Sequence, residues 1–387
     1  MSKIMFSAGE VSGDMHGARL AEAIRRREPQ AELIGFGGRN MEQSGVRLLA
    51  DISDYSVMGV AEVVFSLRKL WQLRDFLTEA MKKEKPDLLV LIDYPDFNWR
   101  LAERAKKLGI PVFSYIPPSA WAWRKGRAKS CAELAEEFVA IFPFETKVYE
   151  EAGANISFLG NPLVDTVKAS MPEAEAGRFF GIREDMYPVL LLPGSRRQEI
   201  ELLFPIMLEA AKLIKKEKPE TEFFLPVAQG IKKERLEELI AASGVKVTMT
   251  AEHTYDLMRL CRYALAASGT VVMEAAIMEL PCIVLYRFNI LSYLIGKILI
   301  GHIDHFSLPN ILAGEGILPE LLQGEVTPER ILSEARRYFA DEAHGEDIRR
   351  RLRATVALLG EPDASGRIAE RILAAAARHR KSAGEEI

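Results

Sequence analysis

Two successive series of short apolar segments, each followed by an amphipathic stretch, limit most strongly how this chain can fold. The β-prone segments of the first series are residues 4–8, 32–37, 88–93, 112–116, 138–142 and 156–159. Those of the second series are residues 189–192, 222–227, 245–250, 263–267, 282–286 and 306–308. Helical periodicity follows them, for example at residues 16–27, 67–83 and 99–108. Strands that alternate with helices build parallel sheets. The sequence therefore predicts an α/β protein with two doubly wound, Rossmann-like domains and a ligand cleft between them.

The boundary between the two series is predicted within residues 161–183, where prolines, glycines and an acidic cluster interrupt the alternation. Such a composition is typical of a linker or a peripheral helix. We expect an N-terminal domain over residues 1–165 and a C-terminal domain over residues 166–345. Beyond about residue 325 the pattern is helical only, and we expect residues 346–387 to pack back on the N-terminal domain or on a partner chain, as in a homodimer.

Composition argues against several classes of protein. The 387 residues carry a formal net charge of −4, so no overall basic field is available to bind nucleic acid. The cysteines, Cys131, Cys261 and Cys282, are widely spaced, which favours a reducing compartment over disulfides or a zinc site. The N-terminus does not resemble a signal peptide, and the most apolar stretch, residues 290–303, is too short to span a membrane. We therefore expect a cytoplasmic protein.

Several common catalytic motifs are missing from the sequence. It contains no Walker A motif, no G-x-G-x-x-G after the first strand, no G-x-S-x-G and no H-E-x-x-H. No two aspartates are separated by a single residue, so a D-x-D clamp for a metal and a diphosphate is also lacking. We expect no metal and no bound cofactor.

One candidate phosphate site lies at residues 191–199, where Gly194, Ser195 and Arg196 stand between an apolar strand and a long amphipathic stretch. The free backbone N–H groups and the dipole of such a helix start attract phosphate, and an arginine adds a charge-assisted contact. The alternative is an ordinary serine-capped helix with an arginine on its surface. The residues alone leave both interpretations open.

A second strand end of this kind contains Ser268, Gly269 and Thr270. Glu274 follows about one helical turn later, where its carboxylate can accept hydrogen bonds from ribose hydroxyls. The alternative is that Glu274 only complements the helix N-terminus. Two such helix starts in one half of the chain favour a nucleoside diphosphate.

In the first half, residues 93–98 place two carboxylates directly after the most apolar strand. Asp93 is a candidate general base for a hydroxyl group, provided that its surroundings raise its pKa from the ordinary value near 4. Asp96 is expected to be a turn or helix-capping aspartate.

The loop at residues 7–17 follows the first strand and is rich in glycine, hydroxyl and acidic residues. Glycines let the backbone approach a sugar, and Glu10, Asp14 and His16 can bond hydroxyls or transfer protons. The alternatives are that Asp14 caps a helix and that His16 lies on a helix surface.

Two further surfaces combine aromatic and basic residues. Residues 119–125 set Trp121 and Trp123 beside cations, which suits either sugar stacking or core packing. Residues 63–74 form an amphipathic basic segment with Trp71, which suits either a membrane-interface anchor or a helix packed on a sheet.

Seven motifs, in one order along the chain, resemble those of the lipid-A-disaccharide synthase family. They are AGEVSGD at 8–14, VMGVAEV at 57–63, DYPDFN at 93–98, WAWR at 121–124, LPGSR at 192–196, SGT at 268–270 and SLPN at 307–310. The resemblance runs from about residue 4 to about residue 330. It implies a GT-B glycosyltransferase fold and a reaction without a metal. UDP-2,3-diacylglucosamine would donate its sugar to the 6-hydroxyl of 2,3-diacylglucosamine 1-phosphate, with inversion, giving the β-1,6 disaccharide of the lipid A precursor and UDP.

By position, the resemblance makes Asp93 the base for the acceptor hydroxyl and puts Ser195 and Arg196 at the diphosphate of UDP. The other residues that it places at the UDP-sugar are Gly194, Ser268, Gly269, Thr270, Glu274, Arg287 and Asn310. The candidates on the acceptor side are Glu10, Ser12, Asp14, Met58, Glu62, Asp96 and Trp123.

Acylated substrates also give the apolar surfaces a function. We expect residues 63–74 and 290–303 to reach into the cytoplasmic leaflet of the inner membrane, with Arg68, Lys69 and Arg74 near anionic head groups. The protein would then be cytoplasmic and peripherally associated with that membrane.

Two alternatives remain at this point. One is another GT-B enzyme that acts on a UDP-sugar, such as a 2-epimerase or a different lipid-linked sugar transferase. The other is a non-catalytic protein that binds a sugar nucleotide and shows no turnover.

Overall fold

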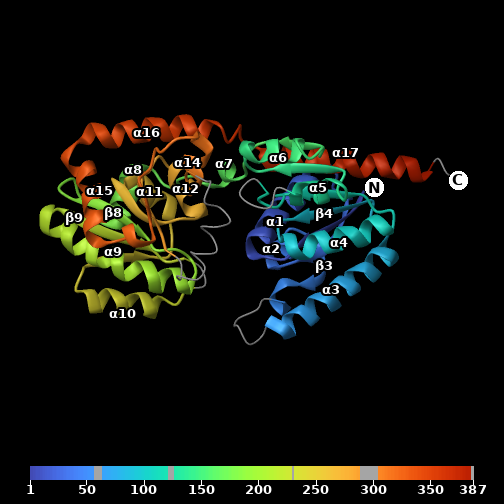
Figure 1. Cartoon of the computed structure of the whole chain (residues 1–387), viewed down its shortest axis with the longest axis horizontal. Helices are drawn as coiled ribbons and strands as arrows, with labels where there is room; N and C mark the ends of the chain where they lie inside the picture. Colours follow the sequence, from blue (N-terminus) through green and yellow to red (C-terminus); the bar gives the residue numbers. More distant parts are fainter. Residues whose placement is uncertain (56–62, 121–125, 229–230, 288–303, 385–387) are drawn as a thin grey trace. The chain divides into compact units, whose positions relative to one another are not determined.

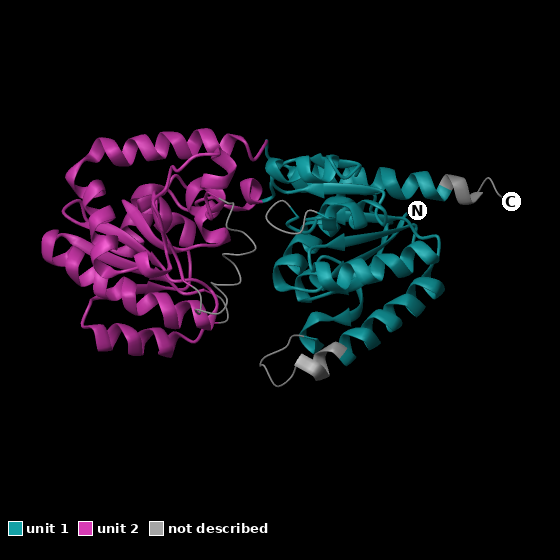
Figure 2. Ribbon diagram, in the orientation of Figure 1, with its two compact units in different colours: residues 1–162, 361–387 teal, residues 163–360 magenta. Residues whose placement is uncertain are grey.

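The computed structural model describes residues 1–55, 63–120, 126–228, 231–287 and 304–384 (Figure 1). The chain forms two compact units, one of residues 1–162 and 361–387 and one of residues 163–360 (Figure 2). We call them unit 1 and unit 2. Each is built on a single parallel sheet with helices packed against it.

Unit 1 contains a seven-stranded sheet with the order β3-β2-β1-β4-β5-β6-β7. Its strands are β1 (Lys3–Ala8), β2 (Glu32–Gly37), β3 (Arg47–Asp51), β4 (Leu88–Ile92), β5 (Val112–Tyr115), β6 (Glu137–Ala140) and β7 (Ile156–Phe158). Its α-helices are α1 (Val11–Arg27), α2 (Arg39–Gln43), α3 (Val63–Glu84), α4 (Pro95–Lys107), α5 (Gly126–Ala132), α6 (Thr146–Glu150) and α17 (Ala364–Gly384). The central strands β1 and β4 are fully buried apart from Lys3, because helices cover both faces of the sheet.

Unit 2 repeats this design with six strands in the order β10-β9-β8-β11-β12-β13. The strands are β8 (Tyr187–Leu192), β9 (Thr221–Pro226), β10 (Val247–Thr250), β11 (Tyr263–Ala267), β12 (Cys282–Tyr286) and β13 (Glu320–Leu322). The α-helices are α7 (Leu163–Thr166), α8 (Glu173–Phe180), α9 (Arg197–Glu217), α10 (Lys233–Ser243), α11 (Thr254–Leu260), α12 (Thr270–Ile277), α14 (Leu308–Ala313), α15 (Pro328–Ala340) and α16 (Glu342–Ala357). In both sheets the order corresponds to the doubly wound pattern 3-2-1-4-5.

The last helix returns to unit 1. Ile368, Ile372 and Ala376 of α17 belong to the core that also contains α1 and β4, and the Arg371 guanidinium lies 2.6 Å from the carboxylate of Glu137 in β6. The sequence-based division kept residues 346–387 together, whereas in the structure α16 belongs to unit 2 and only residues 361–387 join unit 1. The chain therefore passes between the units twice, near Pro162 and near Gly360.

Most predicted strands are present within one or two residues of their expected bounds, but one predicted strand is wrong. Residues 306–308 do not form a strand, because α14 begins at Leu308 after Ser307, with a proline in its first turn. Two short strands at the sheet edges were not predicted. β3 is polar at both ends, and β13 has only three residues and begins with a glutamate, so neither shows a long apolar run.

Candidate functional site

The strand order reverses between β1 and β4 in unit 1 and between β8 and β11 in unit 2. Ligands of doubly wound sheets bind beyond the carboxyl ends of the strands at such a switch point. The loops that follow these four strands contain most of the residues predicted to bind substrate or to catalyse.

The turn after β4 holds Asp93 in a strained backbone conformation. Asp93 and Tyr94 both adopt left-handed conformations, with φ of 48° and 51°, although neither is a glycine. Such residues cost on the order of 1–3 kcal/mol each and persist only where the surroundings enforce them. One enforcing contact is the Asp93 N–H, which donates to the carbonyl oxygen of Tyr115 at the end of β5 (3.2 Å). Another is Gly9, where any Cβ atom would fall 2.0 Å from the Tyr94 ring.

Asn98 holds this turn in place through buried hydrogen bonds. Its side chain is 1% exposed, and its amide N–H groups donate to the carbonyl oxygens of Asp93 (2.6 Å) and Ser7 (3.1 Å). The Ser7 hydroxyl donates in return to the Asn98 side-chain oxygen (2.6 Å). Asn98 thus ties the end of β1 to the end of β4. Sequence reasoning included it in a motif but gave it no role.

The surroundings of Asp93 raise the pKa of its carboxyl group, as a general base requires. Burial is the main cause that raises the pKa of Asp93, and the Glu10 carboxylate raises it further, against a lowering by the Tyr94 N–H. A carboxylate with a raised pKa accepts a proton more readily near neutral pH. The condition that the sequence set for Asp93 is therefore met in the structure.

Glu145 is a second buried carboxyl group at this edge, and sequence reasoning missed it. It follows β6, is 5% exposed, and accepts hydrogen bonds from the N–H groups of Ile141 (3.2 Å) and Phe142 (3.1 Å). Burial raises the pKa of Glu145 to about 7, opposed by these N–H groups and reinforced by Asp93. A glutamate two residues after an aromatic-proline pair has no recognisable signal in a single sequence.

The acidic residues of the first loop divide into two kinds. Asp14 is 2% exposed, and its carboxylate accepts hydrogen bonds from the N–H groups of Gly38, Asn40 and Met41. It caps the start of α2, so its role is structural. Glu10, by contrast, is exposed, stands at the N-cap of α1 and makes no capping bond there.

The other predicted residues of unit 1 vary in their surroundings. Ser12 is exposed, and Asp96 is 91% exposed in its side chain and ion-paired with Arg127 (2.8 Å). Asp96 lies in the first turn of α4 but is not its N-cap, which is Tyr94. Burial lowers the pKa of His16 to about 4, so this histidine is neutral. The remaining acceptor-side candidates, Met58, Glu62 and Trp123, lie outside the described residues.

In unit 2 the start of α9 is already occupied by a carboxylate. Glu199 accepts hydrogen bonds from the N–H groups of Ser195 (3.2 Å) and Arg196 (3.3 Å), and its other oxygen lies 2.9 Å from the Arg196 guanidinium. Gly194 has φ of 106°, and a Cβ atom there would fall 2.4 Å from the Glu199 carboxylate. The N-cap is Arg196 and not a serine. The N–H groups of Ser195 and Arg196 can therefore bind an anion, because they already bind the carboxylate of Glu199.

At the start of α12, no side-chain capping bond is present among the residues that the structure describes. Its N-cap is Gly269, which offers no side chain, and a Cβ atom there would meet open space. The Thr270 side chain is exposed, and Ser268 is half-buried with its hydroxyl 3.5 Å from the Phe306 carbonyl oxygen. Glu274, one turn further, lines a pocket of about 360 Å³. The two helix starts of unit 2 thus differ in what fills them.

Two more residues predicted at the UDP-sugar are Arg287 and Asn310. Arg287 is exposed just after β12. Asn310 is fully buried: its amide donates to the Leu318 carbonyl oxygen (2.9 Å) and accepts from the N–H groups of Ile317 and Leu318 (both 2.9 Å). Asn310 therefore braces the turn between α14 and β13.

In the described part of the chain, no group of three or more His, Cys, Asp or Glu side chains is placed to hold a metal ion. No helix among the same residues is long and apolar enough to cross a membrane.

Comparisons with known proteins identify close relatives. A family model for lipid-A-disaccharide synthetase matches residues 4–370. The lipid-A-disaccharide synthase of Geobacter sulfurreducens is 40% identical over 371 residues, 96% of either chain. That of Syntrophus aciditrophicus is 42% identical over 369 residues, 95% of this chain and 96% of the other.

Solved structures with the same fold are more distant in sequence. A UDP-GlcNAc 2-epimerase from Neisseria meningitidis bound to UDP-GlcNAc has a TM-score of 0.64 at 15% identity, covering 96% of this chain and 99% of that one. The calicheamicin glycosyltransferase CalG4 has a TM-score of 0.61 at 14% identity, covering 98% and 99%. These likenesses confirm the predicted GT-B type of fold and establish nothing beyond it.

Proposed function

Because this chain belongs to the lipid-A-disaccharide synthetase family, we propose that it joins UDP-2,3-diacylglucosamine to 2,3-diacylglucosamine 1-phosphate. As a member of that family it is a glycosyltransferase of lipid A biosynthesis. The proposal concerns the two acylated substrates and the residues that act on them. The products are the β-1,6 disaccharide 1-phosphate and UDP.

The observation that carries the proposal is the braced, strained turn that presents Asp93 with a raised pKa. Asp93 accepts the proton of the acceptor 6-hydroxyl while the oxygen of that hydroxyl bonds to the anomeric carbon of the donor sugar. The bond from that carbon to UDP breaks on the opposite face, so the configuration inverts. A base held in one geometry lowers the barrier by fixing the attack trajectory and by receiving the proton.

Unit 2 supports the departure of UDP. The Arg196 guanidinium and the backbone N–H groups of Ser195 and Arg196 stabilise the charge that develops on the diphosphate. The uncapped start of α12 at Gly269 and Thr270 supplies a second set of donors. Glu274 accepts hydrogen bonds from the ribose hydroxyls. These charges supply the stabilisation that a metal ion gives in other sugar-nucleotide enzymes.

On the acceptor side we propose contacts from Glu10 and Ser12, which are exposed at the start of α1. Asp14 is left out because its carboxylate is committed to α2. Asn98 and Asn310 act indirectly, since each holds a turn and offers little or no exposed surface.

The test compares disaccharide formation by the wild type, Asp93→Asn and Arg196→Ala, with UDP affinity measured by calorimetry. Loss of a general base costs about 10²- to 10⁴-fold in kcat, so Asp93→Asn should lose that much and still bind UDP normally. Arg196→Ala should instead weaken UDP binding and raise the KM for the donor. Undiminished turnover by the asparagine variant would remove Asp93 as the base.

We also propose that α3 attaches the protein to the inner leaflet of the cytoplasmic membrane. Leu73 and Leu77 pack into the core, while Trp71 and Phe76 on the same helix are 52% and 51% exposed. Arg68 and Lys69 lie exposed nearby and suit anionic head groups. The predicted anchor at residues 290–303 and the side chains of 63–67 lie outside what the structure describes.

Membrane attachment is measured by co-sedimentation with vesicles containing anionic phospholipid. Trp71→Ser together with Phe76→Ser should reduce binding several-fold without loss of folding, because both side chains contribute exposed apolar area. The exposed Phe179→Ser on α8 serves as a matched control. Equal binding by the α3 double variant and this control would count against the anchor.

A further inference from the structure

A pocket beside Glu274 is walled by two segments that sequence reasoning did not connect with the nucleotide. Lys168 and Ser170 line it from the segment before α8, and His253 lines it from the loop after β10. Its volume of about 360 Å³ is within the range of small-ligand sites. Lys168 is exposed and Glu274 is a carboxylate, so the pocket offers partners both to phosphate and to hydroxyl groups.

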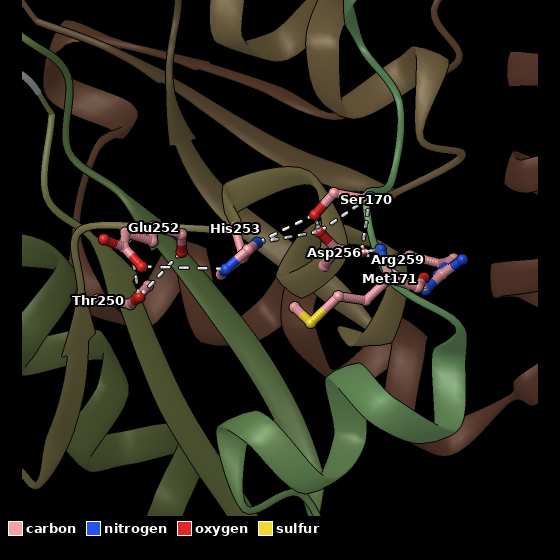
Figure 3. Close-up of polar contacts among 7 residues, drawn as sticks. All are labelled: Ser170, Met171, Thr250, Glu252, His253, Asp256 and Arg259. Carbon is pink, nitrogen blue, oxygen red and sulfur yellow. Dashed lines mark hydrogen bonds and ion pairs between the residues drawn. The ribbon is translucent and has the colours of Figure 1, made fainter.

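Asp256 holds one wall of this pocket in place (Figure 3). Its side chain is 1% exposed, and it accepts hydrogen bonds from the N–H groups of Ser170 (2.9 Å) and Met171 (2.8 Å) and from the Ser170 hydroxyl (2.6 Å). Burial works to raise the pKa of Asp256, but these bonds and the nearby Arg259 hold it below its usual range. Asp256 is therefore an ionised anchor for the segment before α8.

Ser170 connects Asp256 to His253 on the other wall of the pocket. Its hydroxyl oxygen lies 3.0 Å from Nδ1 of His253, whose backbone is left-handed with φ of 58° (Figure 3). Because the Ser170 proton is donated to Asp256, the serine oxygen can only accept from the imidazole, which fixes the proton of His253 on Nδ1. A nucleophilic serine would need the reverse, with its proton shared with the histidine. The arrangement is thus a brace and not a hydrolytic triad.

We propose that Asp256, Ser170 and His253 are positioning residues that shape the pocket beside Glu274 for the nucleotide part of the donor. The proposal rests on the proposed function and extends it to a group of residues outside the seven motifs. Asp256 fixes Ser170, and Ser170 fixes the imidazole at the wall that faces the pocket of Glu274. Breaking this chain of contacts loosens the pocket but leaves the proton transfer at Asp93 untouched. A variant that breaks these contacts should therefore bind the donor substrate more weakly and keep an unchanged kcat.

The experiment uses the full chain with UDP as the calorimetric probe and both substrates in kinetics. Ser170→Ala removes both hydroxyl contacts, to His253 and to Asp256, but leaves the bonds from the backbone N–H groups to Asp256. Loss of one such hydrogen bond network should weaken UDP binding and raise the donor KM by about three- to tenfold. We expect kcat to change by less than about twofold, the acceptor KM to stay constant, and Ser170→Thr, which keeps the hydroxyl, to restore binding. Asp185→Asn is the matched control, since it breaks only the exposed pair with Arg183.

Normal UDP affinity in folded Ser170→Ala would overturn the inference, and so would a fall in kcat with an unchanged donor KM. Ser170→Ala and its threonine rescue decide the question, because the backbone N–H bonds to Asp256 remain in both variants. A wild type that neither binds UDP nor forms disaccharide would overturn the proposed function as well. A wild type that does both, beside a Ser170→Ala variant that equals it, would overturn only this inference.

Discussion

The two units share one strand order but carry opposite chemistry at the carboxyl edges of their sheets. In unit 1 this edge holds carboxyl groups, namely Asp93, Glu10 and Glu145, with Asp93 and Glu145 kept at raised pKa. In unit 2 it holds backbone N–H donors and Arg196, together with the exposed Lys168. The fold decides where a ligand binds, and the residues after each strand decide whether that place handles a proton or an anion.

The manner in which each edge is held also differs. In unit 1, Asn98 bonds directly to the carbonyl group of the proposed base. In unit 2, Asn310 bonds only to the turn between α14 and β13, and the proposed anion site is held by Glu199. Unit 1 therefore holds its proposed base by a buried contact, whereas the proposed anion site of unit 2 is filled by the carboxylate of Glu199, which is 23% exposed in its side chain. The predictions below test this difference.

The largest expected effect concerns the buried Glu145 carboxyl group of unit 1, whose pKa is raised. The pKa of Glu145 is about 7 in the folded protein, against an ordinary value of 4.5. The folded unit keeps a proton that the unfolded chain has released, so its stability is full below about pH 4.5 and falls as pH rises to about 7. At 1.36 kcal/mol per pKa unit the loss is on the order of 3 kcal/mol. In Glu145→Gln this pH dependence should disappear.

The measurement is urea unfolding at pH 5 and pH 8, followed by tryptophan fluorescence. All four tryptophans of the sequence lie within residues 1–162, so the signal reports unit 1. Glu150→Gln, on the exposed side of α6, is the control. An equally pH-dependent midpoint in Glu145→Gln would show that this carboxyl group is ionised in the folded unit.

Next in size is the effect of removing the brace below Asp93. Asn98→Ala leaves the carbonyl groups of Asp93 and Ser7 without their amide donors and frees the strained turn. A small displacement of a catalytic group costs about 10²-fold in rate, so kcat should fall by about that factor. UDP affinity should stay the same, because Asn98 belongs to unit 1 and the proposed UDP-binding residues belong to unit 2.

Asn155→Ala is the control for this variant, since its side chain makes one long hydrogen bond at the surface. Steady-state kinetics and calorimetry on the same preparations separate the two readouts. A kcat within threefold of the wild type would mean that the turn holds its shape without Asn98, and that the contrast between the two edges is overstated.

The sequence places the predicted site residues at strand ends, and the structure shows supports for them that the sequence did not indicate. Asp93, Arg196 and Glu274 were predicted because they follow apolar strands, and parallel strands bring their ends to one edge. Asn98, Glu145, Glu199 and Asp256 were not given their roles, because each acts through a partner that periodicity does not identify. Asp256 bonds to Ser170, 86 residues away, and Asn98 bonds to Ser7, 91 residues away. The resemblance to a family suggested the reacting groups but not these long-range contacts.

The smallest expected effect belongs to the displaceable anion of unit 2. Glu199 occupies the N–H groups of Ser195 and Arg196 and pairs with the Arg196 guanidinium, which is 82% exposed. A diphosphate that takes these donors must first move Glu199 away. In Glu199→Gln the pairing with arginine is lost, and an exposed pair is worth only about 0.2–1 kcal/mol. UDP should therefore bind up to about fivefold more tightly, and its slower release should lower kcat if release limits turnover. Glu201→Gln, on the same helix as Glu199, is the control, and its carboxylate pairs with Arg235 of α10. Weaker UDP binding by Glu199→Gln would mean that Glu199 supports the bound nucleotide, and that the anion edge of unit 2 is as rigidly built as the carboxyl edge of unit 1.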